Sequence, residues 1–322
     1  FLVMVPETGL LYCFYHKNAG VVDYDLAMTG VLAWRVSEDD GATWSESFRT
    51  TIGRSAIDHP DPKYLSNWVP TGWQVPIVNG RNQIVVPITR HATALYHSER
   101  RFPSQQHHEA WFLRFDNIFT EVNPSKIIVT TWPQADHGIQ IPNPADPLSS
   151  ACREPAIQNL SDGRILCFMR TMTGTIQYSI SPDYGESWSD PEILRFEPQG
   201  NPVLHPHAPC AFYRLNSGRY LLLFHNNDGT ANNASGLADG KNRRPVWASI
   251  GHEIDNPGGQ PIAFSKPDVF YDNSDTDGKP GGPLSLYGSL TEYAGVSMWW
   301  YPDDEGFLLG KRVPEDLLNR DR

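Results

Sequence analysis

Arg170 is the residue whose setting first suggests chemistry. It directly follows the apolar run Ile165–Met169. A guanidinium without a partner is costly in such a place. We therefore expect Arg170 to face either a pocket that binds an anion or the carboxylate of a structural ion pair.

Histidines are the second group of residues that could do chemistry. Seven of them fall in inserts or at the ends of apolar runs: His91, His97, His107, His108, His205, His207 and His225. Imidazole can move a proton or bind a metal. However, the sequence has no H-x-x-x-H or H-E-x-x-H pattern, and its four cysteines form no C-x-x-C pair. We predict no metal site and interpret most of these histidines as pocket-wall or loop residues.

One eight-residue pattern occurs twice and indicates how these residues are positioned. Residues 37–44 (SEDDGATW) and 181–188 (SPDYGESW) both read S-x-D-x-G-x-[ST]-W. We expect a tight turn between antiparallel strands, in which the Asp accepts backbone N–H groups, the Gly has a positive φ and the Trp folds back over the hairpin. The alternative is two unrelated Asp-Gly hairpins.

A longer unit also repeats along the chain: an apolar run, a glycine turn and a second apolar run. Its five copies are Leu2–Phe14, Val75–Ile88, Ala156–Met169, Cys210–Phe224 and Leu290–Tyr301. A further strand pair usually follows, so each repeat holds about four strands. Inserts at 51–70, 89–108, 131–152 and 225–242 separate the repeats, and long loops on a regular scaffold often carry function.

These repeats predict an all-β fold, namely a six-bladed β-propeller of four-stranded antiparallel blades, with residues 1–322 as a single domain. Five copies, and a closing blade built from both chain ends, give six blades. Because Phe1 lies in an apparent strand, we expect the first strand of the domain to be missing. A β-sandwich is the alternative, but it does not explain why whole units recur with the same turn.

Composition excludes several classes of function. The net charge of −11 argues against a nucleic-acid-binding surface, which needs a basic stripe. No stretch approaches 18 apolar residues, so we predict no membrane-spanning helix. The oligomeric state stays open.

The segment from Glu154 to Arg170 connects these patterns to a known family. A Glu opens a strand, an Asp-Gly turn follows, an Arg closes the return strand, and the S-x-D-x-G-x-[ST]-W turn comes about ten residues later. This order resembles the central segment of sialidases, whose repeated turn is called the Asp-box. The resemblance implies a glycan substrate and favours a secreted or extracytoplasmic location.

The resemblance also implies a reaction. Sialidase substrates carry a carboxylate on the anomeric carbon, which would repel a carboxylate nucleophile, so the family uses a Tyr. A Glu draws the proton from this Tyr, an Asp acts as acid and then as base, and three Arg bind the substrate carboxylate. No organic cofactor is needed.

Residues matching these roles can be named one by one. Glu154 would be the base, and Arg170 the second Arg of the triad. The third Arg of the triad should precede the strand that starts at Pro245. Arg243 and Arg244 both lie there, and we slightly prefer Arg244. The alternative for each is a surface or structural residue.

The nucleophile and the acid follow from the same comparison. Tyr287, in Leu-Tyr-Gly-Ser-Leu, fits the family's Y-S-x-L motif with Gly in place of Ser, and Tyr293 is the alternative. Asp25 would be the acid/base, favoured over Asp23 by its spacing to Arg35.

Aromatic residues could complete the pocket. Trp68, Trp73 and Trp111 could stack on a sugar, although Trp73 and Trp111 adjoin apolar runs and fit a core equally well.

Two departures from the family pattern weaken the match. The family's first Arg lies in an Arg-Ile-Pro motif that would fall before Phe1. Where the family tends to carry another Arg, this chain has Tyr15-His16-Lys17.

The sequence thus predicts a retaining exo-glycoside hydrolase that releases a terminal sialic acid or a related 2-keto-3-deoxy sugar acid. The alternatives are a non-catalytic carbohydrate-binding propeller, and a lyase or hydrolase that uses His and Tyr on uronic-acid polysaccharides.

Overall fold

The computed structural model describes residues 1–18, 29–71, 76–100, 107–231, 238, 240–273, 284–302 and 307–320. The chain divides into two compact units, which we describe separately. The first comprises Phe1–Pro142, Asp146–Pro155 and Ser181–Ser189, and the second comprises Asn143–Ala145, Ala156–Ile180 and Asp190–Arg322.

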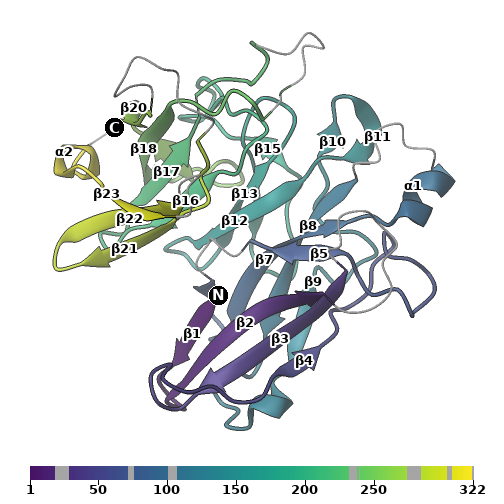
Figure 1. Ribbon diagram of the computed structural model, residues 1–322. Helices are drawn as coiled ribbons and strands as arrows, with labels where there is room; N and C mark the ends of the chain where they lie inside the picture. The colour runs from purple at the N-terminus through teal and green to yellow at the C-terminus, as the bar shows by residue number, and fades with distance from the viewer. Residues whose placement is uncertain are drawn as a thin grey trace. The chain divides into compact units, whose positions relative to one another are not determined.

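The first unit holds two antiparallel sheets (Figure 1). The first sheet has the order β1 (Leu2–Val5), β2 (Leu10–Asn18), β3 (Gly30–Ser37), β4 (Phe48–Thr50). The second has the order β5 (Trp68–Pro70), β7 (Ile84–His91), β8 (His108–Phe115), β9 (Val129–Trp132), and β6 (Ile77–Val78) also pairs with β7. Smaller elements are the helix α1 (Ala94–Arg100), the 3-10 turn η1 (Pro124–Lys126) and the paired strands β10 (Pro142–Asn143) and β11 (Asp146–Ser150).

The second unit carries most of the third sheet and all of the fourth and fifth. The third sheet has the order β12 (Arg153–Asn159), β13 (Ile165–Arg170), β14 (Gln177–Ser181), β15 (Glu192–Ile193). The fourth has the order β16 (Ala211–Arg214), β17 (Tyr220–Phe224), β18 (Val246–Glu253), β19 (Ile262–Phe264), and β20 (Asp268–Tyr271) also pairs with β18. The fifth consists of β21 (Ser289–Tyr293), β22 (Val296–Pro302) and β23 (Leu308–Arg312), and the short helix α2 (Glu315–Leu318) follows.

Within each unit, consecutive sheets pack through apolar side chains. In the first unit, Phe14 of β2 meets Phe115 of β8 with ring centroids 4.5 Å apart, inside one shared core. In the second unit, Phe168 of β13 and Phe212 of β16 are 4.2 Å apart, and Phe270 of β20 lies beside Trp299 of β22. Strands covered on both faces are apolar along their buried length, as in residues Ile165–Met169 of β13 and in β17.

This is the packing of consecutive propeller blades, and the prediction of an all-β, antiparallel β-propeller is confirmed. The predicted number of blades is wrong. The described residues form five blade-sized sheets, not six. The prediction added a closing blade from both chain ends, but β1 pairs with β2 inside the first blade, and β21–β23 form a separate sheet. None of the helices in the described ranges has the length and apolar character needed to cross a bilayer.

Both Asp-boxes form the predicted turn. Asp39 Oδ1 accepts the Thr43 backbone N–H (2.8 Å), and Asp183 Oδ1 accepts that of Ser187 (2.7 Å). Gly41 has the positive φ that the pattern predicted, at 91°. Hydrogen bonds, mainly from Thr43, lower the pKa of Asp39 to about 2. The turn therefore holds its carboxylate ionised.

The tryptophans of the two boxes differ in their surroundings. Trp44 lies next to Gly41 of its own turn, as predicted. Trp188 stacks on Phe112 of β8, with centroids 4.2 Å apart and an interplanar angle of 17°. The second Asp-box is thus packed against the second blade.

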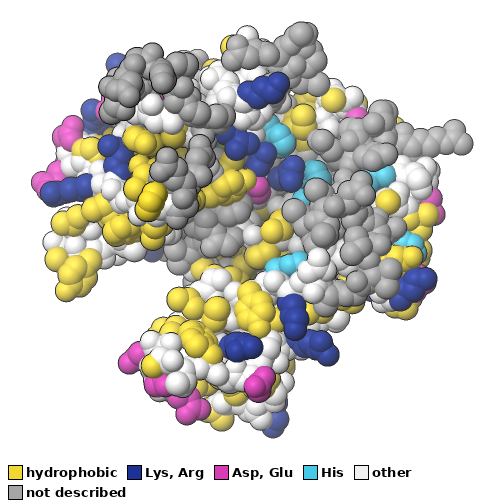
Figure 2. Space-filling model, viewed as in Figure 1, with side chains coloured by type: hydrophobic (Ala, Val, Ile, Leu, Met, Phe, Trp, Pro, Cys, Tyr) yellow, Lys and Arg dark blue, Asp and Glu magenta, His cyan; other side chains and the backbone are white. Residues whose placement is uncertain are grey.

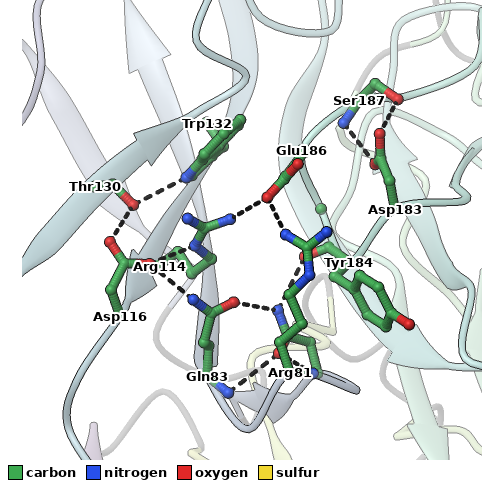
Figure 3. Close-up of polar contacts among 12 residues, drawn as sticks. Arg81, Gln83, Arg114, Asp116, Thr130, Trp132, Asp183, Tyr184, Glu186 and Ser187 are labelled. Carbon is green, nitrogen blue, oxygen red and sulfur yellow. Dashed lines mark hydrogen bonds and ion pairs between the residues drawn. The ribbon is translucent and has the colours of Figure 1, made fainter.

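Polar contacts also fix this second Asp-box (Figure 3). Glu186 accepts hydrogen bonds from Arg81 and from Arg114 Nη1, the latter at 3.0 Å. The Arg81 guanidinium lies over the Tyr184 ring, 4.7 Å from its centroid. A single turn therefore contacts the second blade through an aromatic stack and two ion pairs, all within the first unit.

Candidate active site

Several predicted site residues follow or precede strands at the ends of their sheets. In the second blade, His91 at the end of β7 pairs with His108 at the start of β8. In the fourth, Phe224 at the end of β17 pairs with Trp247 near the start of β18. Residues that follow one strand and precede the next therefore lie side by side at this end of the sheet.

Arg170 and Tyr287 are in contact. Arg170 ends β13, and only 7% of its surface is exposed. Its Nη1 donates a hydrogen bond to Tyr287 Oη over 3.4 Å. Tyr287 is half-buried and precedes β21, so the contact joins ends of the third and fifth blades within the second unit. The structure thus brings two predicted site residues, 117 positions apart in sequence, to one place.

Arg243 and Arg244 have different partners. Arg243 Nη2 donates a hydrogen bond to the His207 carbonyl at 3.1 Å. The positive charges of Arg243 and Arg170 both help to lower the pKa of His205. Arg244 Nε instead lies 3.3 Å from Asp272 Oδ1. Arg243 is thus the arginine near His205, whereas Arg244 pairs with Asp272, and the choice between them as the third Arg of the triad stays a prediction.

Two histidines of this region are held neutral. His205 Nδ1 accepts the His225 backbone N–H at 3.1 Å, so its proton is on Nε2, which faces the Ala208 carbonyl at 3.0 Å. Burial, with the nearby arginine charges, lowers the pKa of His205 to about 4. Burial also lowers the pKa of His225 well below its ordinary value, and its Nδ1 faces the Pro245 carbonyl. Imidazoles with such low pKa values are weak bases near pH 7.

Glu154 lies in the first unit, near the start of β12. Its φ is 47°, an uncommon value for a residue other than glycine, and its backbone N–H donates to Thr89 Oγ1 at 2.7 Å. Strain of this kind is concentrated at functional sites. Nearby, His91 is 1% exposed, and burial, with the charge of Arg153, lowers its pKa to about 3.

The remaining predicted residues have other positions. Asp23, Asp25 and Trp73 lie outside the described residues. Tyr293, the alternative nucleophile, lies at the opposite end of β21 from Tyr287 and is 86% exposed. Trp111 is buried in the core, which was one of its two predicted settings.

The structure assembles a cluster that the sequence motifs missed, in the first unit. Glu109 is fully buried, and its Oε1 accepts hydrogen bonds from His107 Nε2 (3.1 Å), His137 Nδ1 (2.7 Å) and Gln140 Nε2 (2.7 Å). Its Oε2 accepts the Trp111 indole N–H and the Gly138 amide, both at 2.9 Å. His137 is 28 positions from Glu109, so no short motif could reveal the cluster.

Two histidines and a carboxylate could form a donor set for zinc. However, the position of the ring proton on His107 does not fit metal binding. The Ser150 backbone N–H donates to His107 Nδ1 at 3.2 Å, which requires the lone pair there. The proton of the neutral ring is then on Nε2, the atom facing Glu109. A histidine that binds a metal shows the opposite arrangement, because its other ring nitrogen donates a proton. We therefore assign this cluster to hydrogen bonding around a buried carboxylate.

Comparison with known proteins identifies the family. The model of the BNR repeat-like domain matches residues 2–256. The chain belongs to this family. No curated protein matches this BNR repeat-like chain in sequence.

Solved structures share the fold of this BNR repeat-like chain. The Hadza microbial sialidase Hz136 aligns over 98% of this chain and 52% of its own, with 12% identity and a TM-score of 0.53. An intramolecular trans-sialidase from Ruminococcus gnavus aligns over 99% of this chain and 63% of its own, with 19% identity and a TM-score of 0.52. A Dyadobacter fermentans protein of unknown function aligns over 96% of this chain and 73% of its own, with 13% identity and a TM-score of 0.51. The chain thus spans roughly half to two thirds of the two sialidases.

The Glu109 cluster leads to a prediction about acid stability. Burial alone would raise the pKa of Glu109, but hydrogen bonds from His107, His137 and Gly138 outweigh burial and lower it. The unfolded chain therefore binds more protons, and the stability that Glu109 contributes is lost as the pH falls below about 4.5. We expect Glu109→Gln to reduce the free energy of unfolding at pH 7 by on the order of 2 kcal/mol.

Thermal midpoints measured between pH 7 and pH 3 test this prediction. The wild type and Glu109→Gln should converge toward acid pH, because below about pH 4.5 Glu109 of the unfolded wild-type chain binds a proton that the folded protein does not bind, which stabilises the unfolded state. Glu315→Gln removes an exposed carboxylate at the start of α2; it serves as the control and should follow the wild type. A constant difference at every pH would contradict the assignment.

Proposed function

We propose that this protein is a sialidase-like glycoside hydrolase. It releases a terminal sialic acid or a related 2-keto-3-deoxy sugar acid with retention of configuration. The observation that carries the proposal is the contact between Arg170 Nη1 and Tyr287 Oη. The family membership and the shared fold support it.

Each residue has a role that its chemistry suits. Tyr287 attacks the anomeric carbon, because a neutral phenol is not repelled by the substrate carboxylate. Arg170 and Arg243 bind that carboxylate through charge-assisted hydrogen bonds, and Arg244 is the alternative to Arg243. Arg170 also stabilises the negative charge that develops on the phenol oxygen.

Two further roles complete the reaction. Glu154 takes the proton of Tyr287, and its strained backbone is typical of a catalytic position. Asp25, or Asp23 in its place, protonates the leaving oxygen and later activates water. We also propose a terminal glycoside on a glycan or glycoconjugate as the substrate.

The histidine-dependent lyase is the less favoured reaction. It needs a base that can remove a carbon-bound proton near neutral pH. His205, His225 and His91 are buried and have lowered pKa values, so each is a weak base there.

A substrate assay tests the proposal. The protein is incubated with 4-methylumbelliferyl sialoside, and the first-formed sugar is followed by proton NMR. We expect fluorescence and a first product that keeps the α configuration of the substrate. Ultraviolet absorbance from an unsaturated product on a uronic-acid polysaccharide would instead indicate a lyase. Binding of sialosides without turnover would indicate a non-catalytic propeller.

A further inference from the structure

A cavity of about 530 Å³ lies at the opposite end of the fourth and fifth blades from Tyr287 and Arg243. Three segments of the second unit form it: the turn between β16 and β17, the turn between β21 and β22, and the end of α2. Its lining includes Asn216, Arg219, Glu292, Tyr293, Ser297 and Asn319. The candidate active site uses none of these residues.

Tyr293 gives the cavity an aromatic wall. Hydrophobic side chains gather over the blade β21–β23 in Figure 2, and Tyr293 is the most exposed of them, at 86%. The next residues, Ala294 and Gly295, have φ values of 48° and 78°, which close a tight turn directly after the Tyr. A large aromatic side chain left in solvent by a tight turn is a common element of a binding surface.

Glu292 supplies a carboxylate in a fixed orientation. Its Oε2 accepts the Asn216 backbone N–H at 2.6 Å, and its Oε1 accepts Ser297 Oγ at 3.0 Å. An ionised carboxylate has about four acceptor positions, so roughly two remain for a ligand. The carboxylate can therefore accept hydrogen bonds from ligand hydroxyl groups without rearrangement.

The rim of the cavity offers further hydrogen-bonding groups. The side-chain amides of Asn216 and Asn319 are exposed and make no hydrogen bond to another described residue. Arg219 Nη1 donates to the Leu318 carbonyl at 2.8 Å, which fixes the end of α2 against the β16–β17 turn. The polar groups thus stand on walls that are connected to one another.

The charged residues that line this cavity favour a neutral ligand over an acidic one. Glu292 would repel an acidic sugar, and Arg219 already donates to main-chain carbonyls. A neutral pyranose fits, because its apolar face can stack on Tyr293 while its hydroxyl groups bond to Glu292 and the amides. We propose that this cavity is a second carbohydrate site, which binds a neutral sugar residue. This proposal rests on the proposed function only in the expectation that the protein binds glycans.

Binding experiments on Tyr287→Phe protein test this site separately from turnover. The probes are methyl β-galactoside, methyl β-glucoside and N-acetylneuraminic acid, measured by saturation-transfer NMR and calorimetry. We expect a neutral glycoside to bind, and a further Tyr293→Ala substitution to weaken this binding about tenfold. Tyr293→Phe should retain it, because stacking needs only the ring. Glu292→Gln should weaken it about threefold or more through the loss of charge-assisted hydrogen bonds.

Leu308→Ala is the matched control, because Leu308 is also exposed on the fifth blade but does not line the cavity. Two results would overturn the proposal: neither neutral glycoside binds, or Tyr293→Ala binds as well as Leu308→Ala. An absence of sialosidase activity would end the proposed function but would leave this binding measurement unaffected.

Discussion

Tyr287→Phe should reduce kcat on a fluorogenic sialoside by about three orders of magnitude or more, with little change in stability. The substitution removes the nucleophilic oxygen and keeps the ring. It also removes the hydrogen bond from Arg170, which at 3.4 Å is long and contributes little to folding. The measurement is steady-state turnover together with the thermal midpoint of each protein.

A second Tyr serves as the control for loss of a hydroxyl group. The single O–H proton of Tyr220 faces two acceptors, Glu253 Oε1 at 2.7 Å and the Asn159 carbonyl oxygen at 2.9 Å, so this hydroxyl has a structural role. Tyr220→Phe should lower the thermal midpoint and leave kcat nearly unchanged. If Tyr287→Phe keeps more than about a tenth of the wild-type kcat, Tyr287 is not the nucleophile.

Arg170→Lys separates carboxylate binding from nucleophile activation. Lysine keeps the charge but loses the paired donors of a guanidinium, so KM should rise more than kcat falls. An unchanged KM would contradict the role of Arg170 in binding the substrate carboxylate.

The Asp-boxes could be predicted in detail because their contacts are local. Asp183 bonds to Ser187, four residues away, so the bonding partners are present in the pattern itself. The repeat of apolar runs and glycine turns revealed the blades for a similar reason, since neighbouring strands in a blade are close in sequence.

Long-range features could not be predicted in this way. The number of blades depends on which strands pair, and the pairing of β1 with β2 excludes the closing blade inferred from sequence. The partners that distinguish Arg243 from Arg244 are His207 and Asp272, which lie 36 and 28 positions away in sequence. The contact of Arg170 with Tyr287 was expected only through resemblance, because no local pattern connects the two residues.

Asp58 and Arg90 form another long-range pair, and it carries the largest expected effect on stability. Arg90 Nη1 and Asp58 Oδ2 are 2.8 Å apart, and the two side chains are 0% and 1% exposed. Asp58 also accepts Ser66 Oγ at 3.0 Å, and the Arg90 guanidinium lies over the Trp111 ring at 4.6 Å. We expect Asp58→Ala to lower the free energy of unfolding by about 3–5 kcal/mol, because it leaves a buried charge without its partner.

Two comparisons establish that the effect comes from the unpaired charge. The double variant Asp58→Leu, Arg90→Met removes both charges and should be more stable than Asp58→Ala, because no isolated ion remains buried. Arg312 and Glu315 form an exposed pair, with side chains 55% and 69% accessible, so Glu315→Ala should cost less than about 1 kcal/mol. Urea unfolding followed by tryptophan fluorescence measures all three. If the double variant were no more stable than Asp58→Ala, the lost packing around Asp58 rather than the charge of Arg90 would account for the loss.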